Sequence, residues 1–326
     1  MVSFVIRRLL ISIPVVLLSS VLVFLLVANS GDPLSELKSR QPPVPQEVIK
    51  AREHALYLDR SEPVRYGIWI SHFVRGDMGT TLDGRDVRTL LGQRLPVTLR
   101  MISLAMLLAL ILGVGVGVVS AVKQYTPTDY TFTFFGFLFL SMPVFWLAAL
   151  LKEFLAIRVN QALGRVVFFT VGDQTPNLAG NLVQRLGNYA GHLVLPTVTL
   201  ALITFASWSR YQRGSMLEVL SSDYIRMARA KGLSRSRVML RHALRNALIP
   251  LVTVAAIDIG ALFGGAVITE NVFSWHGMGE LLINGVTIGD VNVVLAWLMV
   301  TAIIVILFNL LADVLYAVLD PRIRYG

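Results

Sequence analysis

Six long apolar runs limit the possible folds of this 326-residue chain more than any other feature. A helix rises about 1.5 Å per residue, so roughly 20 apolar residues cross the hydrocarbon layer of a membrane. Most of the runs reach that length. The runs are Leu9–Ala28, Met101–Val122, Thr131–Leu151, Leu193–Trp208, Ala247–Ile268 and Val291–Leu319. They predict an all-α integral membrane protein with six transmembrane helices.

The composition agrees with this class. Charged residues make up 15% of the chain and the mean hydropathy is +0.67, whereas soluble domains carry about 25% charged residues. The net charge is +9. Because basic loops fix the orientation of membrane proteins, the location of this charge matters more than its total. The absence of cysteine excludes disulfides and thiolate chemistry.

Two of the runs have alternative interpretations. The fourth is short and contains Pro196, so a five-span protein with this run buried or re-entrant is an alternative. Arg7 and Arg8 before the first run resemble the start of a signal peptide. However, the run is longer than the about 7–15 apolar residues of a signal peptide, and Ala28-Asn29-Ser30 is a poor cleavage site. We therefore expect the first helix to be retained.

The segments between the runs differ in charge. Residues 209–246 hold nine Lys/Arg and two acids, whereas residues 269–290 hold three acids and no base. Residues 29–95 hold ten Lys/Arg and nine acids, and a segment of this length crosses largely regardless of charge. With six spans, the positive-inside rule makes both termini and the 209–246 loop cytoplasmic and the 29–95 segment external. A five-span chain would break this agreement.

The basic loop is centred on Gly232. Asp223–Lys231 suits a short helix, and glycine is the residue that ends helices in a left-handed conformation. Ser234 can cap a second helix. Three arginines four residues apart would line one face of that helix: Arg237, Arg241 and Arg245.

Three kinds of partner could balance this charge. Anionic lipid headgroups attract nearby basic residues by about 1 kcal/mol each. Nucleic acid is a second candidate, although the chain shows no recognition fold. The third is a cytoplasmic protein that uses the helix–Gly–helix element as its contact.

Five segments carry a family resemblance. The first is DYIRMARAKGLS…RHALRNALIP, which begins at Asp223. The others are LYLDRSEPVRYGIWI (Leu56–Ile70), RGDMGTTLDGRDV (Arg75–Val87), FSWHGMGELLINGV (Phe273–Val286) and LLADVLYAVLDPRIR (Leu310–Arg324). Together they resemble the B-type permease subunits of binding-protein-dependent ABC importers, in the oligopeptide/dipeptide (peptide/nickel) branch.

The sequence departs from the family pattern at a few positions. Arg226, Met227 and Ala228 occupy the Glu-Ala-Ala places of the cytoplasmic loop, so the glutamate of the general motif is absent. His276 stands where proline is usual, and Tyr57 replaces a glycine.

The resemblance implies the type I ABC importer permease architecture, with a long external segment between helices 1 and 2. It implies a transport subunit rather than an enzyme, located in a bacterial plasma (inner) membrane. The implied partners are a second, C-type permease subunit, two ATPase subunits or a fused ATPase, and an external substrate-binding protein. Peptide is the implied substrate, and nickel or another small solute is the alternative.

The resemblance also implies that the loop docks on the ATPase and couples it to transport. The corresponding residues are Asp223, Tyr224, Arg226, Ala228, Arg229, Ala230, Lys231, Gly232 and Leu233. ATP and Mg would bind the ATPase subunits, with no cofactor, metal or catalytic residue expected in this chain. The sequence indeed lacks the glycine-rich Walker A loop that cradles phosphates. The glycines of Gly113–Val119 lie inside an apolar run, where glycine lets helices pack closely.

Two rival classes fit the sequence less well. A secondary transporter would be expected to show a buried ionisable network and internal repeats, whereas this chain shows one mid-membrane acid. An intramembrane enzyme would need catalytic spacing, but the five histidines are scattered and no serine nucleophile elbow occurs.

That acid is Asp258, near the middle of the fifth run. A charge there costs about 2.5–3.5 kcal/mol on insertion scales, so it should face a bundle interior or a wet cavity. It is a candidate pathway group, or it accepts a hydrogen bond from a Ser, Thr or Asn of a neighbouring helix.

Four residues are candidates for external docking of the binding protein: Trp69, Asp77, Glu270 and Trp275. For Trp69 the alternative is anchoring at the membrane interface. For the whole external region the alternative role is a lid.

The predicted organisation has four parts. Residues 1–28 form the cytoplasmic end and first helix, and residues 29–95 the external segment. Residues 96–320 form the permease core with the coupling loop 209–246, and residues 321–326 the cytoplasmic tail.

Overall fold

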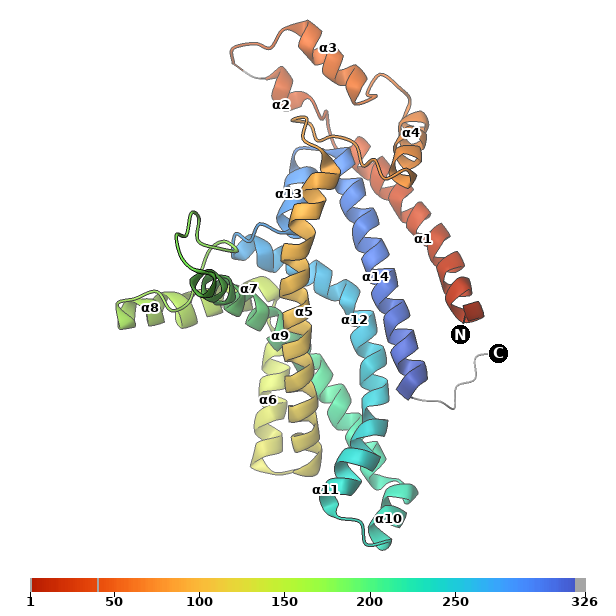
Figure 1. Ribbon diagram of the computed structural model, residues 1–326, viewed down its shortest axis with the longest axis vertical. Coiled ribbons are helices and arrows are strands. Elements are labelled where there is room, and N and C mark those ends of the chain that lie inside the picture. The colour runs from red at the N-terminus through yellow and green to blue at the C-terminus, as the bar shows by residue number, and fades with distance from the viewer. Residues whose placement is uncertain (1, 40, 320–326) are drawn as a thin grey trace. The chain divides into compact units, whose positions relative to one another are not determined.

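The computed structural model describes residues 2–39 and 41–319, and their regular structure is helical (Figure 1). The predicted tail at 321–326 lies outside the described residues. The helices are α1 Val2–Ala28, α2 Ser35–Lys38, α3 Gln46–Ala55, α4 Glu62–Val74, α5 Val87–Val122, α6 Pro127–Ser141, α7 Val144–Leu150, α8 Arg158–Leu163, α9 Leu182–Ser221, α10 Asp223–Ala230, α11 Arg235–Arg237, α12 Arg245–Val272, α13 Met278–Thr287 and α14 Val291–Leu319. Two π-helical segments, Leu151–Ile157 and Val238–Leu244, complete the set for these residues.

Five helical segments are long and apolar enough to cross a membrane. They are Leu10–Ala28, Val87–Val122, Leu182–Ser221, Arg235–Val272 and Val291–Leu311. Each contains or overlaps one of the predicted runs, so five of the six predicted spans are confirmed as long apolar helices.

The remaining run has a different form from the one predicted. Instead of one straight helix over Thr131–Leu151, the chain forms the pair Pro127–Ser141 and Val144–Leu163, bent by 111°. The break lies at Met142 and Pro143, where Met142 is extended (φ −84°, ψ 126°). Proline disfavours the helical region for the residue before it and cannot donate a backbone hydrogen bond. The pair is a broken span or a re-entrant element.

The run around Pro196 belongs to a much longer helix than its apolar length suggests. Helix α9 extends over 40 residues, with Pro196 buried inside it. Asn181 and Gln184 start the helix as a capping box, in which each side chain accepts a hydrogen bond from the backbone N–H of the other. The polar first turns therefore extend the helix before the apolar run begins.

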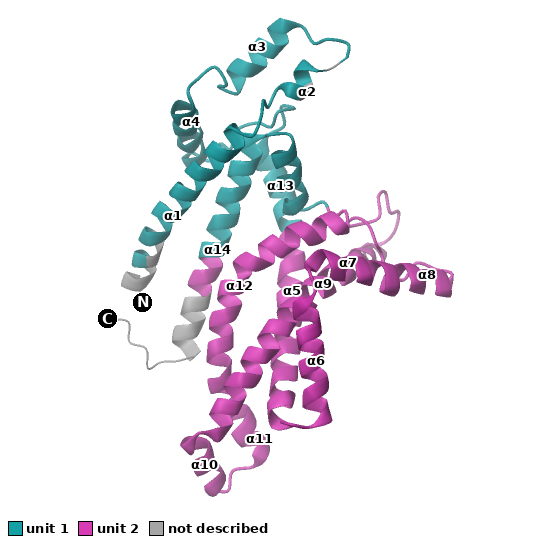
Figure 2. Ribbon diagram, turned by 180° about the vertical axis from the view of Figure 1, so that it is seen from behind, with its two compact units in different colours: residues 1–97, 276–306 teal, residues 98–275, 307–326 magenta. Residues whose placement is uncertain are grey.

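The chain forms two compact units (Figure 2). The first comprises Met1–Val97 and His276–Ile306, and the second comprises Thr98–Trp275 and Leu307–Gly326. The predicted external segment 29–95 thus belongs to the same unit as α13 and the beginning of α14.

The first unit is centred on a cluster of buried apolar side chains from α1, α4, α5, α13 and α14. Phe24 of α1 meets the ring of Tyr66 of α4 edge to face at 5.5 Å. Ser20 hydrogen-bonds the Tyr66 hydroxyl at 2.7 Å. Trp69 stacks on Phe73 at 5.2 Å and is buried. The contacts of Tyr66 with Phe24 and Ser20 attach α4 to α1.

In the second unit α9 packs on both α6 and α12. Helix α5 approaches α9 at two glycines spaced four residues apart. A Cβ atom at Gly113 would lie 3.0 Å from Trp208 Cβ, and one at Gly117 would lie 2.7 Å from Gln212 Cβ. Real Cβ atoms essentially never come as close as the second distance, so glycine is required there. The prediction that these glycines allow close helix packing is confirmed.

Candidate functional site

The basic loop folds as the sequence predicts. Helix α10 covers Asp223–Ala230, followed by Lys231 and then Gly232 in the left-handed region with φ +76°. The N–H of Gly232 donates to the carbonyl oxygen of Arg229 at 3.0 Å. A Cβ at Gly232 would meet no atom within 4 Å, so the backbone conformation, not crowding, selects glycine here.

The apolar side of α10 fixes this element to the rest of the second unit. Ile225 is fully buried and Ala228 nearly so, in a cluster with Met216 of α9, Val238 and Ala247. Ser222 is the one residue between α9 and α10. Both ends and one face of α10 are therefore attached to neighbouring helical segments.

The opposite side of the element is open to solvent. Seven of the nine predicted coupling residues are exposed: Asp223, Tyr224, Arg226, Arg229, Ala230, Lys231 and Gly232. Ala228 is buried and Leu233 partly buried. Arg226 forms an ion pair with Asp223, and both of these side chains remain exposed. The structure thus separates an anchoring face from a polar contact face.

The predicted second helix of the basic loop is not separated from the span that follows it. Ser234 occupies the N-cap position with ψ 146°, without a side-chain capping bond. From Arg235 the helix continues through the π-helical turn Val238–Leu244 into α12. The basic segment is therefore a continuous extension of an apolar span.

An ion pair with a buried carboxylate lies at the start of α6 in the same unit. The guanidinium of Arg213, on α9, donates to both oxygens of Asp129 at 2.8 and 2.7 Å. Ser120 and the N–H of Tyr125 also donate to this carboxylate. The sequence predicted no partner for either residue, because a pairing between residues 84 positions apart leaves no local signal.

Asp258 is half-buried on α12 and accepts a hydrogen bond from the indole N–H of Trp208 at 2.7 Å. Trp208 is fully buried on α9. The donor is an indole rather than the hydroxyl or amide that was one predicted alternative. The bond joins the two spans adjoining the basic loop.

Three of the four candidate docking residues are buried. Trp69 is 7%, Trp275 1% and Glu270 0% exposed, whereas Asp77 is exposed. Glu270 accepts a hydrogen bond from the hydroxyl of Thr98. Trp69 and Trp275 are large apolar rings that their units use as core, so only Asp77 offers its side chain to another protein in this conformation. Within the described residues, no group of three or more His, Cys, Asp and Glu could hold a metal ion.

Comparison with known proteins places these features in a family. Residues 113–325 match the family described as binding-protein-dependent transport system inner membrane component. The chain belongs to this family. The match covers the bent pair, the basic loop and the last two spans, so the predicted family resemblance is confirmed.

Relatives align along the whole length of the chain. The oligopeptide transport system permease protein OppB of Mycobacterium tuberculosis (strain H37Rv) is 44% identical over 324 residues, 99% of each chain. The oligopeptide transport system permease protein AppB of Bacillus subtilis (strain 168) is 37% identical over 328 residues, 100% of each. The dipeptide transport system permease protein DppB of Escherichia coli (strain K12) is 36% identical over 338 residues, 100% of this chain and 99% of that protein.

A solved structure shares the fold. A chain of the MetNI methionine ABC transporter, in an inward facing conformation, superimposes with a TM-score of 0.55 at 20% identity. The superposition covers 71% of this chain and 96% of that one. The prediction of an all-helical ABC importer permease fold is therefore confirmed.

Proposed function

We propose that this chain is the membrane-spanning subunit through which an ABC importer takes up peptides. The full-length similarity to permeases named for oligopeptide and dipeptide transport carries this proposal. An alignment over 99% of both chains includes the outer segment as well as the core, so it supports the same role and not merely the same fold.

The importer would contain separate partners. We expect a C-type permease subunit, two ATPase subunits or one fused ATPase, and an external substrate-binding protein. ATP and Mg would bind the ATPase subunits, since this sequence lacks a Walker A loop. The exposed polar face of α10 and Gly232 supports docking on an ATPase, because it is presented by an element whose other face is buried.

We place the chain in a bacterial inner membrane with both termini and the basic loop cytoplasmic. Nine basic residues against two acids in 209–246, and three acids without a base in 269–290, support this orientation. The 29–95 segment would then face outward and receive the binding protein, with Asp77 as the exposed candidate contact.

Transport would follow alternating access. ATP closes the ATPase subunits and displaces α10 together with Gly232. Because α10 adjoins α9 and the basic segment is continuous with α12, the displacement reaches two spans that pack on each other. The pathway then opens outward to accept peptide, and hydrolysis returns it to the inward state.

The first test is isolation of the tagged chain from its native membrane in mild detergent. We expect an ATPase, a second permease and a binding protein in the eluate, together with ATP hydrolysis and uptake of labelled peptide after reconstitution. A chain that elutes without ATPase activity would contradict the importer. Uptake of another solute but not of peptide would contradict the proposal that peptide is the substrate.

The second test addresses coupling. Gly232→Val should reduce peptide uptake about tenfold while ATP hydrolysis continues, because a β-branched residue at φ +76° costs about 1–2 kcal/mol and reshapes the loop. Gly214→Ala is the matched control, since Gly214 is a helical residue of α9 with open space around it. If both variants transport like the native protein, the loop has no coupling role.

A further inference from the structure

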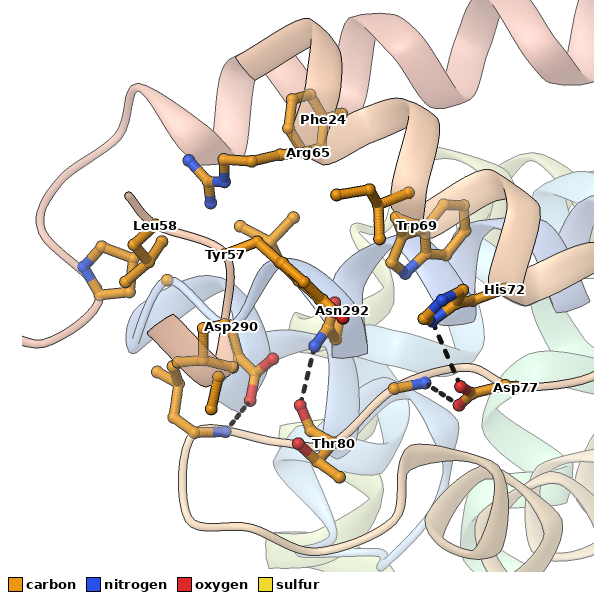
Figure 3. A pocket seen from close by; sticks show the side chains of 18 residues that line it. Phe24, Tyr57, Leu58, Arg65, Trp69, His72, Asp77, Thr80, Asp290 and Asn292 are labelled. Carbon is orange, nitrogen blue, oxygen red and sulfur yellow. Dashed lines mark hydrogen bonds and ion pairs between the residues drawn. The ribbon is translucent and has the colours of Figure 1, made fainter. Parts of the chain in front are cut away.

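A pocket in the first unit is not used by the proposed coupling mechanism. It has a volume of about 230 Å³ and is formed by α1, the turn after α3, α4, the 77–82 loop and the residues around 290 (Figure 3). We infer that this pocket binds the carboxylate of a small ligand with an apolar side chain, such as the C-terminal residue of a short peptide. The choice of a peptide rests on the proposed function.

The first argument is a cation without an acidic partner. Arg65 of α4 lines the pocket and is half-buried. Its described contact is with the ring of Phe24, at 5.6 Å from the guanidinium carbon to the ring centroid. Within the described residues no carboxylate lies within ion-pair distance of it. Burial lowers the pKa of the Arg65 guanidinium, against the opposing effect of Glu62. A desolvated cation in this position favours an added anion.

The second argument is an unpaired donor buried in the wall of the same pocket. The indole nitrogen of Trp69 is buried and, within the described residues, has no hydrogen-bond partner. Buried polar groups are normally paired, so an unpaired one indicates a missing partner. In Figure 3 this nitrogen lies on the side of the ring toward Asn292 and His72, while the Arg65 guanidinium extends toward Tyr57 and Leu58.

Several other polar groups of the pocket are already paired. Asp77 accepts from the N–H of Gly79 at 2.9 Å and pairs with His72 at 3.3 Å. Asp290 accepts from the N–H of Leu82 at 2.8 Å. The Asn292 amide donates to the Thr80 carbonyl oxygen at 2.8 Å.

Among the charged and buried side chains that line the pocket, these pairings leave the Arg65 guanidinium and the Trp69 indole N–H without a hydrogen-bond partner in the described part of the chain. The single guanidinium of Arg65 can balance one negative charge, and Asp77 and Asp290 in the same lining disfavour a doubly charged ligand such as a phosphate dianion. Guanidinium and carboxylate match in geometry and charge.

The walls suit an apolar group next to the carboxylate. They include Phe24, Leu56, Leu58, Ile68 and Val291. Pockets of this kind combine apolar walls with a few polar groups that orient the ligand. Tyr57 also lines the pocket and has a left-handed backbone (φ 56°), a conformation that non-glycine residues rarely adopt.

The test measures equilibrium binding of labelled alanyl-leucine and of its C-terminal amide to the purified full-length chain in lipid nanodiscs, without binding protein. We expect saturable binding of the free acid and about tenfold weaker binding of the amide, since a charge-assisted pair is lost. Arg65→Gln should weaken binding of the acid to the level of the amide, and Arg65→Lys should retain part of the affinity. Trp69→Phe, which keeps an aromatic ring but removes the N–H, should weaken binding by a few-fold.

Arg60→Gln is the matched control, because Arg60 lies on the same segment outside the pocket and is exposed. Equal binding of acid and amide, equal effects of the Arg65 and Arg60 variants, or no saturable binding would overturn the proposal. An Arg65 effect confined to association with the binding protein would also overturn it and reassign the pocket to docking. Peptide uptake by the native importer, measured in parallel, tests the proposed function separately from this binding.

Discussion

Two half-buried arginines, one in each unit, have opposite surroundings. Arg213 of the second unit donates two hydrogen bonds to Asp129, and the same carboxylate also accepts from Ser120 and Tyr125. Arg65 of the first unit has an aromatic ring beside it and no carboxylate at ion-pair distance in the described part of the chain. A buried charge that its own chain satisfies is structural, whereas one left unsatisfied is available to a ligand.

The largest expected effect on stability is at the ion pair between Asp129 and Arg213. Asp129→Asn should destabilise the protein by about 3 kcal/mol, because it leaves Arg213 without its counter-charge. Thermal unfolding in detergent measures this. The double variant Asp129→Asn with Arg213→Gln should recover part of the loss, since no unpaired charge remains. A double variant as unstable as the single one would show that the pair itself matters less than its packing.

The next effect concerns Asp290 beside the proposed pocket. Burial raises the pKa of the Asp290 carboxyl, so the folded state holds a proton more tightly than the unfolded state does. Its contribution to stability is therefore present below the ordinary pKa of 3.8 and is lost as the pH rises through the folded value. Asp290→Asn cannot ionise, so its stability should fall less than that of the native protein as the pH rises above 3.8, which unfolding curves at a series of pH values measure.

Asp86 is a control for Asp290, because its pKa is shifted in the opposite direction. The hydroxyl and N–H of Thr89 donate to its carboxylate and lower its pKa. Its contribution is present above the ordinary pKa of 3.8 and is lost as the pH falls through the lowered value. Unfolding curves of Asp86→Asn should therefore approach the native curves at low pH. Parallel curves for both variants would contradict the assigned directions.

A smaller effect is expected at Asp258. Its carboxylate accepts a hydrogen bond from the indole N–H of Trp208. Asp258 therefore has a partner within the chain, as Arg213 does. Asp258→Asn keeps an oxygen acceptor, so stability should fall by about 1 kcal/mol or less. Uptake of peptides with free and blocked amino ends shows which alternative holds. A selective loss for free amino ends would support a pathway role, and equal uptake would support a structural one.

The smallest effect should be at Arg65. Arg65→Gln removes a partly desolvated charge without an acidic partner, so stability should change by less than about 0.5 kcal/mol. Thermal unfolding without ligand measures this, with Asp129→Asn as the reference. A loss as large as that of the reference would mean that Arg65 holds the first unit together and would remove the contrast between the two arginines.

Much of the fold could be predicted from the sequence because membrane spans depend on local properties. Five of the runs are long apolar helices, and Gly232 has the predicted left-handed backbone. The bent pair at Pro143 was missed, although Met142 before a proline is a local signal for an extended residue. The prediction of one straight span relied on the length of the apolar run and did not use this signal.

The sequence by itself determined five long apolar helices, the division of charge between loops and the family, since each follows from composition or from contiguous motifs. Only the tertiary structure decided which charges have partners. It buried Trp69, Glu270 and Trp275, joined Asp129 to Arg213 and Trp208 to Asp258, and left Arg65 without an acidic partner among the described residues. Pairing and burial depend on residues far apart in the chain, so no local pattern records them.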